Sequence, residues 1–166
     1  MTTWPMQSVF KLSGFDLQEM ELAYAPPFSS AKDPVNMAGY VIGNVMEGLM
    51  KPFYLEDLES IPEDAVRLDV RTVEEYAGGT IPGFINIPLD SLRERMDELD
   101  LTKDIYITCQ IGLRGYLAQR ILDQAGARTW NLSGGYRFYE MKAKDEQSMA
   151  AAMTMCTECG MEVNAK

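Results

Sequence analysis

The segment YITCQIGLRGYLAQRIL (residues 106–122) joins an apolar run to an amphipathic pattern through a short loop that contains two glycines. The run at 104–109 has the β-branched and aromatic character of a strand, and it ends at Cys109. After Gly115, apolar residues recur at helical spacing until Gly126 interrupts the pattern. We therefore expect a strand, a tight loop, and a helix that begins near Gly115.

The same alternation recurs on both sides of this segment. Further strands are expected at AVRLDV (residues 65–70) and within ARTWNLSGG (residues 127–135). Further helices are expected, in chain order, at 54–61, 72–79, 89–99 and 136–144. Strands separated by helices predict an α/β fold with three layers, in which helices flank a central, mainly parallel sheet. In such a sheet, ligand sites collect where strands end and helices begin.

Two of these helices carry specific signals. Thr72 is a candidate N-cap, and Glu75 lies three residues later, as in a capping box. The helix at 89–99 is expected to place three apolar side chains on one face: Leu92, Met96 and Leu99. Between these two helices, residues 81–89 (IPGFINIPL) are expected to form a turn-rich connection.

The N-terminal third of the chain differs from the rest. Asp33 followed by Pro34 predicts an N-cap and the first turn of a helix at 34–49, which would extend the fold at its N-terminus. Its glycines make this helix weak alone, so it should depend on packing. We therefore expect three parts: an N-terminal extension at 1–50, a domain at 51–144 and a C-terminal tail at 145–166.

Composition excludes several classes of function. A net charge of −10 argues against a nucleic acid or an anionic membrane as partner. The sequence contains neither a secretory signal nor an apolar run of the ~20 residues that a membrane span needs. Three cysteines make a poor disulfide framework and favour the reducing cytoplasm. Because the chain has no histidine, an imidazole cannot activate a nucleophile here.

The loop after Cys109 offers another way to activate a thiol. A tight turn into a helix would direct backbone N–H groups and the positive end of the helix dipole toward the sulfur, which favours the thiolate. Gly112 and Gly115 permit the backbone angles of such a turn, and Arg114 could offer a fork of donors to an incoming oxyanion. The candidate substrate-binding residues are those of the loop: Gln110, Ile111, Gly112, Leu113, Arg114 and Gly115. The alternative is a buried structural cysteine that happens to precede a helix.

Several motifs in order resemble a rhodanese-homology domain over residues ~52 to 144. They are the Leu-Asp-Val-Arg strand end, Glu75-Tyr76, the Ile-Pro-Gly turn, the Cys-x-x-Gly-x-Arg loop and Gly134-Gly135. The resemblance implies the rhodanese-like three-layer fold. One position departs from it, because Thr80 stands where such domains usually have histidine before Ile-Pro-Gly.

The N-terminal part resembles a different family. EMELAYAPPFSSAKDPVNMAGYV (residues 19–41) is similar to the end of the dimerisation domain of pyridine nucleotide-disulfide oxidoreductases. Coenzyme A-disulfide reductases fused to a rhodanese domain carry this join, so the chain resembles the C-terminal piece of such a fusion. Tyr24 resembles a tyrosine that approaches the partner subunit's active site in that family. Without a Gly-x-Gly-x-x-Gly fingerprint, no flavin or nicotinamide cofactor is assigned.

The rhodanese resemblance implies sulfur transfer through a Cys109 persulfide. The thiolate would attack a sulfane sulfur donor, loop amides and Arg114 would stabilise the charge, and a thiol or similar acceptor would remove the outer sulfur. Thiosulfate, polysulfide and persulfides of glutathione or coenzyme A all stay open as donors. A non-catalytic module that hands its persulfide to a flavin-dependent disulfide or persulfide reductase also stays open, as does a homodimer.

A phosphatase or arsenate reductase is disfavoured. Four residues separate Cys109 from Arg114, one fewer than in the Cys-(x)5-Arg loops of those enzymes, and this smaller ring is cramped for a tetrahedral phosphate. An acidic group that could serve as general acid also lacks an obvious candidate.

The remaining candidates are assigned structural roles. Asp69 is expected to anchor local backbone, and Arg71 to pair with Glu74 or Glu75 at the rim of the site. Cys156 and Cys159 form one C-x-x-C pair, which could be a redox pair, half of a metal site or an exposed pair prone to oxidation. No metal site is predicted within the chain.

Overall fold

The computed structural model describes residues 12–22 and 33–158, with side chains to residue 150. The chain divides into two compact units, Met1–Lys51 and Pro52–Lys166. None of the described helices is long and apolar enough to cross a membrane.

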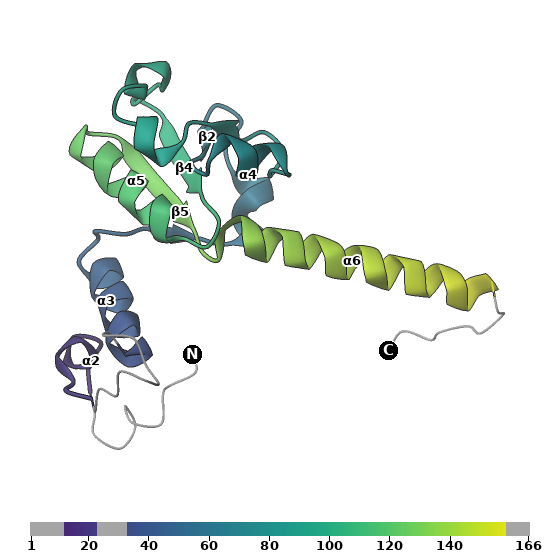
Figure 1. Cartoon of the computed structure of the whole chain (residues 1–166), viewed down its shortest axis with the longest axis horizontal. Helices are drawn as coiled ribbons and strands as arrows, with labels where there is room; N and C mark the ends of the chain where they lie inside the picture. Colours follow the sequence, from purple (N-terminus) through teal and green to yellow (C-terminus); the bar gives the residue numbers. More distant parts are fainter. Residues whose placement is uncertain (1–11, 23–32, 159–166) are drawn as a thin grey trace. The chain divides into compact units, whose positions relative to one another are not determined.

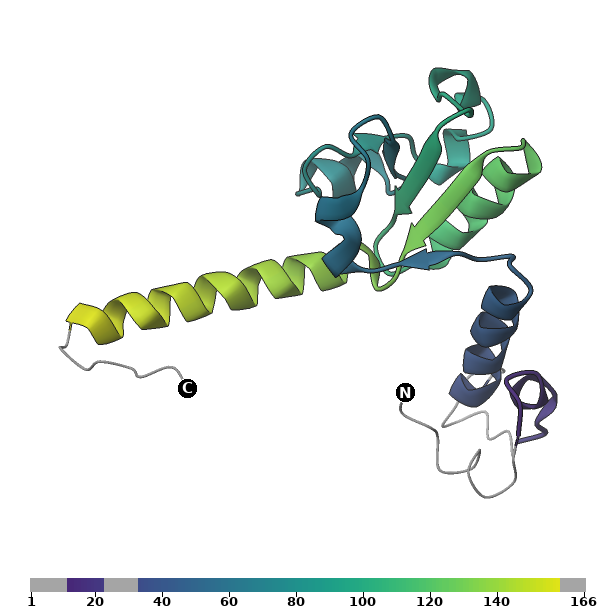
Figure 2. The ribbon, with the colours of Figure 1, turned by 180° about the vertical axis from the view of Figure 1, so that it is seen from behind.

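The second unit is built on a five-stranded sheet in the order β1-β5-β4-β2-β3, with every neighbouring pair parallel (Figures 1 and 2). Its strands are β1 (Pro52–Phe53), β2 (Val66–Asp69), β3 (Ile85–Asn86), β4 (Asp104–Thr108) and β5 (Arg128–Leu132). The expected strands are confirmed as β2, β4 and β5, and the α/β class with a parallel sheet is confirmed with them. β1 and β3 were not predicted, because two-residue strands are too short to show a periodic pattern.

The helices that meet the ends of these strands are α4 (Val73–Ala77), α5 (Leu113–Gln124) and α6 (Gly135–Glu158). Thr72 caps α4 with the predicted capping box. α5 begins at Leu113, two residues earlier than expected, because Gly112 makes the turn at a φ of 122° and accepts the N–H of Tyr116 at 2.9 Å. α6 is much longer than expected and runs through the position at 144–145 where a tail was expected to begin.

The predicted helix at 89–99 is wrong. This stretch forms two short 3-10 helices, Leu89–Ser91 and Met96–Glu98. The Ser91 hydroxyl donates to the Pro88 carbonyl at 3.1 Å, a local bond that competes with a regular helix. Burial still follows the prediction in part, since Leu92 and Leu99 are both in the core. At 54–61 the expected helix is also a 3-10 helix, Leu55–Ser60.

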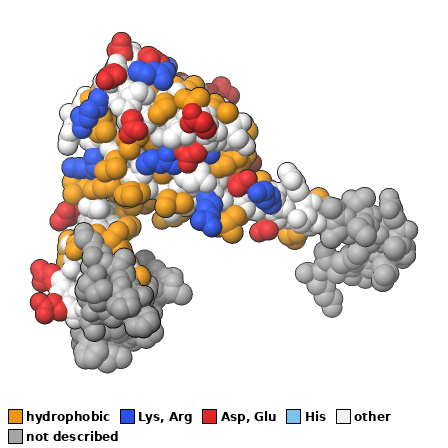
Figure 3. Space-filling view, viewed as in Figure 1, with side chains coloured by type: hydrophobic (Ala, Val, Ile, Leu, Met, Phe, Trp, Pro, Cys, Tyr) orange, Lys and Arg blue, Asp and Glu red, His pale blue; other side chains and the backbone are white. Residues whose placement is uncertain are grey.

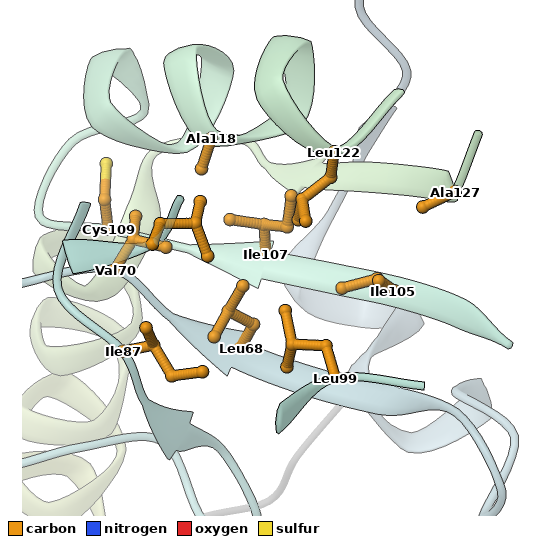
Figure 4. Packing of buried hydrophobic residues seen from close by; sticks show 11 residues of the cluster. Leu68, Val70, Ile87, Leu99, Ile105, Ile107, Cys109, Ala118, Leu122 and Ala127 are labelled. Carbon is orange, nitrogen blue, oxygen red and sulfur yellow. The ribbon is translucent and has the colours of Figure 1, made fainter. Parts of the chain in front are cut away.

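Two apolar clusters fill the second unit. The first packs residues of β2 and β4 with Ala118 and Leu122 of α5, and it includes Cys109 (Figure 4). The second contains Phe53, Leu132 and Phe84, with the partly buried Tyr106 and Trp130 packed against it. Tyr106 alternates along β4 with Ile105 and Ile107 of the first cluster, so the two clusters cover opposite faces of the sheet.

In the first unit, α2 (Asp16–Glu19) packs against α3 (Pro34–Met46). The Asp33 carboxylate accepts the Val35 N–H at 2.9 Å, which confirms the predicted N-cap. Gly39 lies so close to the Leu17 backbone that a Cβ would come within 2.8 Å of it. α3 therefore packs on a neighbour as expected. It ends three residues before the predicted boundary at 49.

Candidate functional site

Cys109 follows the last residue of β4 and lies below the loop that leads into α5 (Figure 4). Its sulfur accepts the backbone N–H of Gly112 at 3.0 Å, so one of the loop amides expected to face the sulfur does so. The residue is only 1% exposed. This burial is compatible both with a structural cysteine and with a reactive thiol. The hydrogen bond to the sulfur favours the reactive thiol.

Hydrogen bonds to the carbonyl groups of the Cys109 loop hold it in place. Tyr136 donates its N–H to the Cys109 carbonyl at 2.8 Å, and Arg137 donates to the Gln110 carbonyl at 3.1 Å. The side chain of Asn131 donates to the Gly112 carbonyl at 3.0 Å. In a trans peptide the N–H points opposite to the C=O. The amides that follow these carbonyls therefore point away from α6 and β5.

Two glycines allow the loop to approach its neighbours this closely. Gly135 has a φ of 60°, and a Cβ there would come within 2.8 Å of the Gln110 carbonyl carbon and collide with the Cys109 carbonyl oxygen. A Cβ on Gly115 would collide with the buried amide of Asn131. Gly135 lets the first turn of α6 bind the loop, and Gly115 lets the first turn of α5 lie on β5.

Arg114 and Glu75 form a two-point ion pair at the edge of the loop. The two guanidinium nitrogens donate to the two carboxylate oxygens at 2.6 and 2.7 Å. The same carboxylate accepts the Thr72 N–H at 2.9 Å as part of the α4 cap. The hydrogen bond from Arg114 is the main cause that lowers the pKa of Glu75 to about 2. Each side chain is about a third exposed, so the pair lies at the rim of the site.

Arg71 is paired differently from the prediction. Its guanidinium binds the Asp69 carboxylate at 2.8 Å, and the side chains are 1% and 0% exposed. Glu75 contributes only its backbone carbonyl to Arg71, at 3.2 Å, so the expected pairing with the Glu74 or Glu75 side chain is wrong. A fully buried carboxylate needs a counter-ion, and this requirement outweighs a contact at the rim.

The Asp69–Arg71 pair links three parts of the site. Asp69 also accepts the backbone N–H of Arg71 at 2.9 Å, so it does anchor local backbone. Arg71 further donates to the Gln110 side chain at 3.4 Å, and its guanidinium carbon lies 3.9 Å from the centre of the Tyr136 ring. The strand end after β2, the Cys109 loop and the first turn of α6 are thereby fastened together.

Two residues of this network were missed in the sequence. Asn131 is a buried polar residue that lies between the apolar Trp130 and Leu132 of β5, and that contrast is a signal that could have marked it. Tyr136 directly follows the paired glycines, but nothing in a single sequence shows that its ring would cover Arg71.

The other predicted loop residues face outward to different degrees. Ile111 and Leu113 are 61% and 63% exposed, whereas Gly115 is buried. The Thr80 hydroxyl donates to the adjacent Ile81 carbonyl at 3.4 Å. Tyr24, Cys159 and the side chain of Cys156 lie outside the described part of the chain. Within that part, no group of three or more acidic or cysteine side chains is placed to hold a metal ion.

Known proteins share this fold. The family model described as Rhodanese-like domain matches residues 55–142. A sulfurtransferase of Allochromatium vinosum is 39% identical over 74 residues, which cover 44% of this chain and 69% of that protein. The reduced CoADR-RHD of Bacillus anthracis is 45% identical, with a TM-score of 0.77 over 81% of this chain and 24% of that one. An NAD-dependent persulfide reductase from A. fulgidus is 37% identical, with a TM-score of 0.68 and the same two coverages.

These findings confirm both resemblances seen in the sequence. This chain matches only about a quarter of the two solved structures, so their whole activities are not carried over. The match to both nevertheless extends well beyond the residues of the family model, which supports a likeness to the end of such a reductase. At the level of the family, the relatives support sulfur transfer. The fold, the order of the motifs and the matched residues together show that the chain belongs to the rhodanese-like domain family.

Proposed function

We propose that this protein is a sulfurtransferase that carries sulfane sulfur as a persulfide on Cys109. The observation that carries the proposal is the Gly112 N–H, which donates to the Cys109 sulfur at 3.0 Å just before α5 begins. A backbone donor and the positive end of a 12-residue helix both favour a negative charge at that point. The sulfur bears this charge as a thiolate before transfer, and the outer sulfur bears it afterwards.

The reaction has two steps whose atoms and charges balance. The Cys109 thiolate attacks the sulfane sulfur of the donor, and the donor's S–S bond breaks with its electron pair on the leaving group. That group is sulfite from thiosulfate, or a thiolate from a persulfide. An acceptor thiolate or cyanide then attacks the outer sulfur of the Cys109 persulfide, which restores the thiolate. The loop amides that point away from α6 and β5 are the donors proposed for the charged outer sulfur.

The first test is the intact mass of the protein after incubation with thiosulfate or polysulfide. Wild type should gain one sulfur atom, which cyanide removes as thiocyanate, and Cys109→Ser should gain none. A Cys156→Ser/Cys159→Ser variant is the matched control, because it keeps Cys109 and removes the other two thiols. A wild type that gains no sulfur at Cys109 would overturn the proposal.

A second candidate is a relay that hands the persulfide to a flavin-dependent reductase. It is favoured by the likeness to CoADR-RHD and to a persulfide reductase over 81% of this chain. Steady turnover with thiosulfate and a small acceptor supports the enzyme. Stoichiometric loading with slow release to small thiols, accelerated by a coenzyme A-disulfide or persulfide reductase, supports the relay.

The remaining assignments follow from the same chemistry. The partners proposed are a sulfane sulfur donor and a thiol acceptor, with no nucleic acid, no membrane and no bound cofactor in the transfer itself. The scarcity of cysteine supports a reducing compartment, the cytoplasm. A homodimer is a further proposal, and measurement of the protein's mass in solution tests it.

A further inference from the structure

We infer that Glu75 sets the charge selectivity of the Cys109 site, because its two-point ion pair with Arg114 makes the loop discriminate against dianionic sulfur donors. The inference rests on the proposed sulfur transfer and adds a specificity-determining residue to it. Glu75 acts through Arg114 and is a positioning residue in this scheme.

Two arginines and their carboxylate partners contribute to the charge around the thiol. Arg114 lies in the first turn of α5, two residues after Gly112, whose N–H donates to the Cys109 sulfur. The hydrogen bond to Glu75 is the main cause that raises the pKa of Arg114. Both oxygens of Glu75 bind its guanidinium. Arg71, whose guanidinium also reaches the loop through the Gln110 side chain, is paired with buried Asp69. The charges of both arginines are therefore balanced by carboxylates.

An incoming donor meets the Arg114–Glu75 pair at the rim of the site. A sulfonate group would bind the same planar fork of Arg114 that Glu75 already occupies. A dianion must therefore approach a thiolate and a carboxylate while the guanidinium of Arg114 is already neutralised by Glu75. Two like charges a few ångströms apart repel each other, and at a partly exposed site water screens this repulsion without removing it. A donor with one charge fewer meets about half of this repulsion, so the site favours it.

Glu75→Gln removes the charge and spares the local fold. A capping box accepts glutamine as well as glutamate, so the bond from the Thr72 N–H can persist. Glu75→Asp keeps the charge and is the conservative variant. Glu98→Gln is the matched control, because Glu98 forms a similar two-point pair with Arg95, at 2.6 and 2.7 Å, and its loss changes the net charge equally.

Two donors that differ by one charge isolate the effect. Thiosulfate and the methanethiosulfonate anion both present a terminal sulfur on a sulfonyl group, and they release sulfite and methanesulfinate. With cyanide as acceptor, each reaction yields thiocyanate and returns the Cys109 thiolate. In a ping-pong reaction, kcat/KM for the donor reports only the first transfer.

Glu75→Gln should raise kcat/KM for thiosulfate about tenfold and for methanethiosulfonate about threefold, mainly through KM. The donor ratio is kcat/KM for thiosulfate divided by kcat/KM for methanethiosulfonate. Glu75→Asp and Glu98→Gln should keep the donor ratio of wild type. Arg114→Gln leaves the Glu75 carboxylate without its partner and should lower the donor ratio. This variant tests the inference independently if Glu75→Gln fails to fold. Equal changes for both donors in the Glu75→Gln variant, an Arg114→Gln ratio that does not fall, or the same shift in Glu98→Gln would overturn the inference.

Mass spectrometry separates this outcome from failure of the proposed function. If wild type and Glu75→Gln both gain sulfur at Cys109 while the donor ratio is unchanged, only the selectivity role fails. If neither gains sulfur from either donor, the sulfur transfer itself is wrong and the selectivity role falls with it.

Discussion

Gly135 is a residue whose lack of a side chain shapes the site. Gly135→Ala introduces two penalties: a Cβ at a φ of 60°, and a collision with the carbonyl groups of Cys109 and Gln110. We expect the free energy of unfolding to fall by about 2–3 kcal/mol, of which the backbone strain supplies about 1 kcal/mol. Sulfur loading of Cys109 should also slow, because the loop must shift away from α6. Denaturant unfolding and time-resolved intact mass measure the two effects.

Gly126→Ala is the control for this prediction. Gly126 also has a positive φ, of 91°, but a Cβ there would meet nothing within 4 Å. It should therefore cost only the backbone strain, about 1 kcal/mol, and leave loading unchanged. Equal losses of stability in the two variants would contradict the proposed collision with the loop.

The Glu75–Arg114 pair should make stability depend on pH in a defined window. The pKa of Glu75 in the folded protein is about 2, below its ordinary 4.5, because Arg114 binds the carboxylate. A lowered carboxyl pKa stabilises the folded state above the unfolded value and loses this contribution as pH falls from about 4.5 toward 2. Glu75→Gln should therefore lose stability at pH 6 and differ progressively less from wild type toward pH 2. Urea unfolding at a series of pH values measures the difference.

A double-mutant cycle makes the assignment specific. Arg114→Gln should remove the same pH-dependent part, and the double variant should lose little beyond either single change. Strictly additive losses would mean that the two side chains do not stabilise each other in solution.

At the scale of elements, α4 is the least self-sufficient part of the site. It has only five residues and depends on the Thr72 cap and on the contacts of Glu75 and Arg71. Thr72→Ala removes the hydroxyl that accepts the Glu75 N–H and should cost about 1 kcal/mol, whereas Thr72→Ser keeps the acceptor and should cost less. Thermal unfolding compares the two. If serine and alanine destabilise equally, the methyl group of Thr72 matters and the cap does not.

The elements also show what a sequence can predict. The Thr72 cap and the strand–loop–helix around Cys109 depend on residues close together in the chain, so local pattern was sufficient for them. The helix predicted at 89–99 was wrong, because two 3-10 helices whose side chains reach one core give the same spacing of apolar residues as one regular helix. The predicted partner of Arg71 was wrong for another reason. The local sequence favoured Glu74 or Glu75, which follow Arg71 in the chain. Only the fold shows that Asp69 is buried and needs a counter-ion.

At the scale of the whole molecule, acidic side chains outnumber basic ones, 25 to 15. The net charge is −10, yet acidic and basic side chains are intermixed on the face of the second unit seen in Figure 3. We therefore expect selection among anionic donors to depend on groups near the loop more than on a broad field. This expectation is the reason to alter the Glu75–Arg114 pair, and not the overall charge, when selectivity is tested.

The boundary between the two compact units lies after Lys51. Both apolar clusters are formed by residues that lie after position 52. A chain of residues 51–166 should therefore fold and load sulfur within about twofold of the full chain, because the network that holds the Cys109 loop is complete within it. The proposed parts at 1–50 and 51–144 predict this independence.

A chain of residues 55–166 should behave differently, although the match to the family begins at 55. It lacks β1, so the Ser133 N–H loses its bond to the Phe53 carbonyl and β5 becomes an edge strand. It also lacks the Phe53 ring, which lies 5.1 Å from Tyr106 in an edge-on contact. Loss of a buried phenylalanine costs about 3–5 kcal/mol, so the midpoint of urea unfolding should fall steeply. Equal midpoints for the two shortened chains would place the boundary after β1, and a 51–166 chain that cannot fold would show that the first unit is part of the same fold.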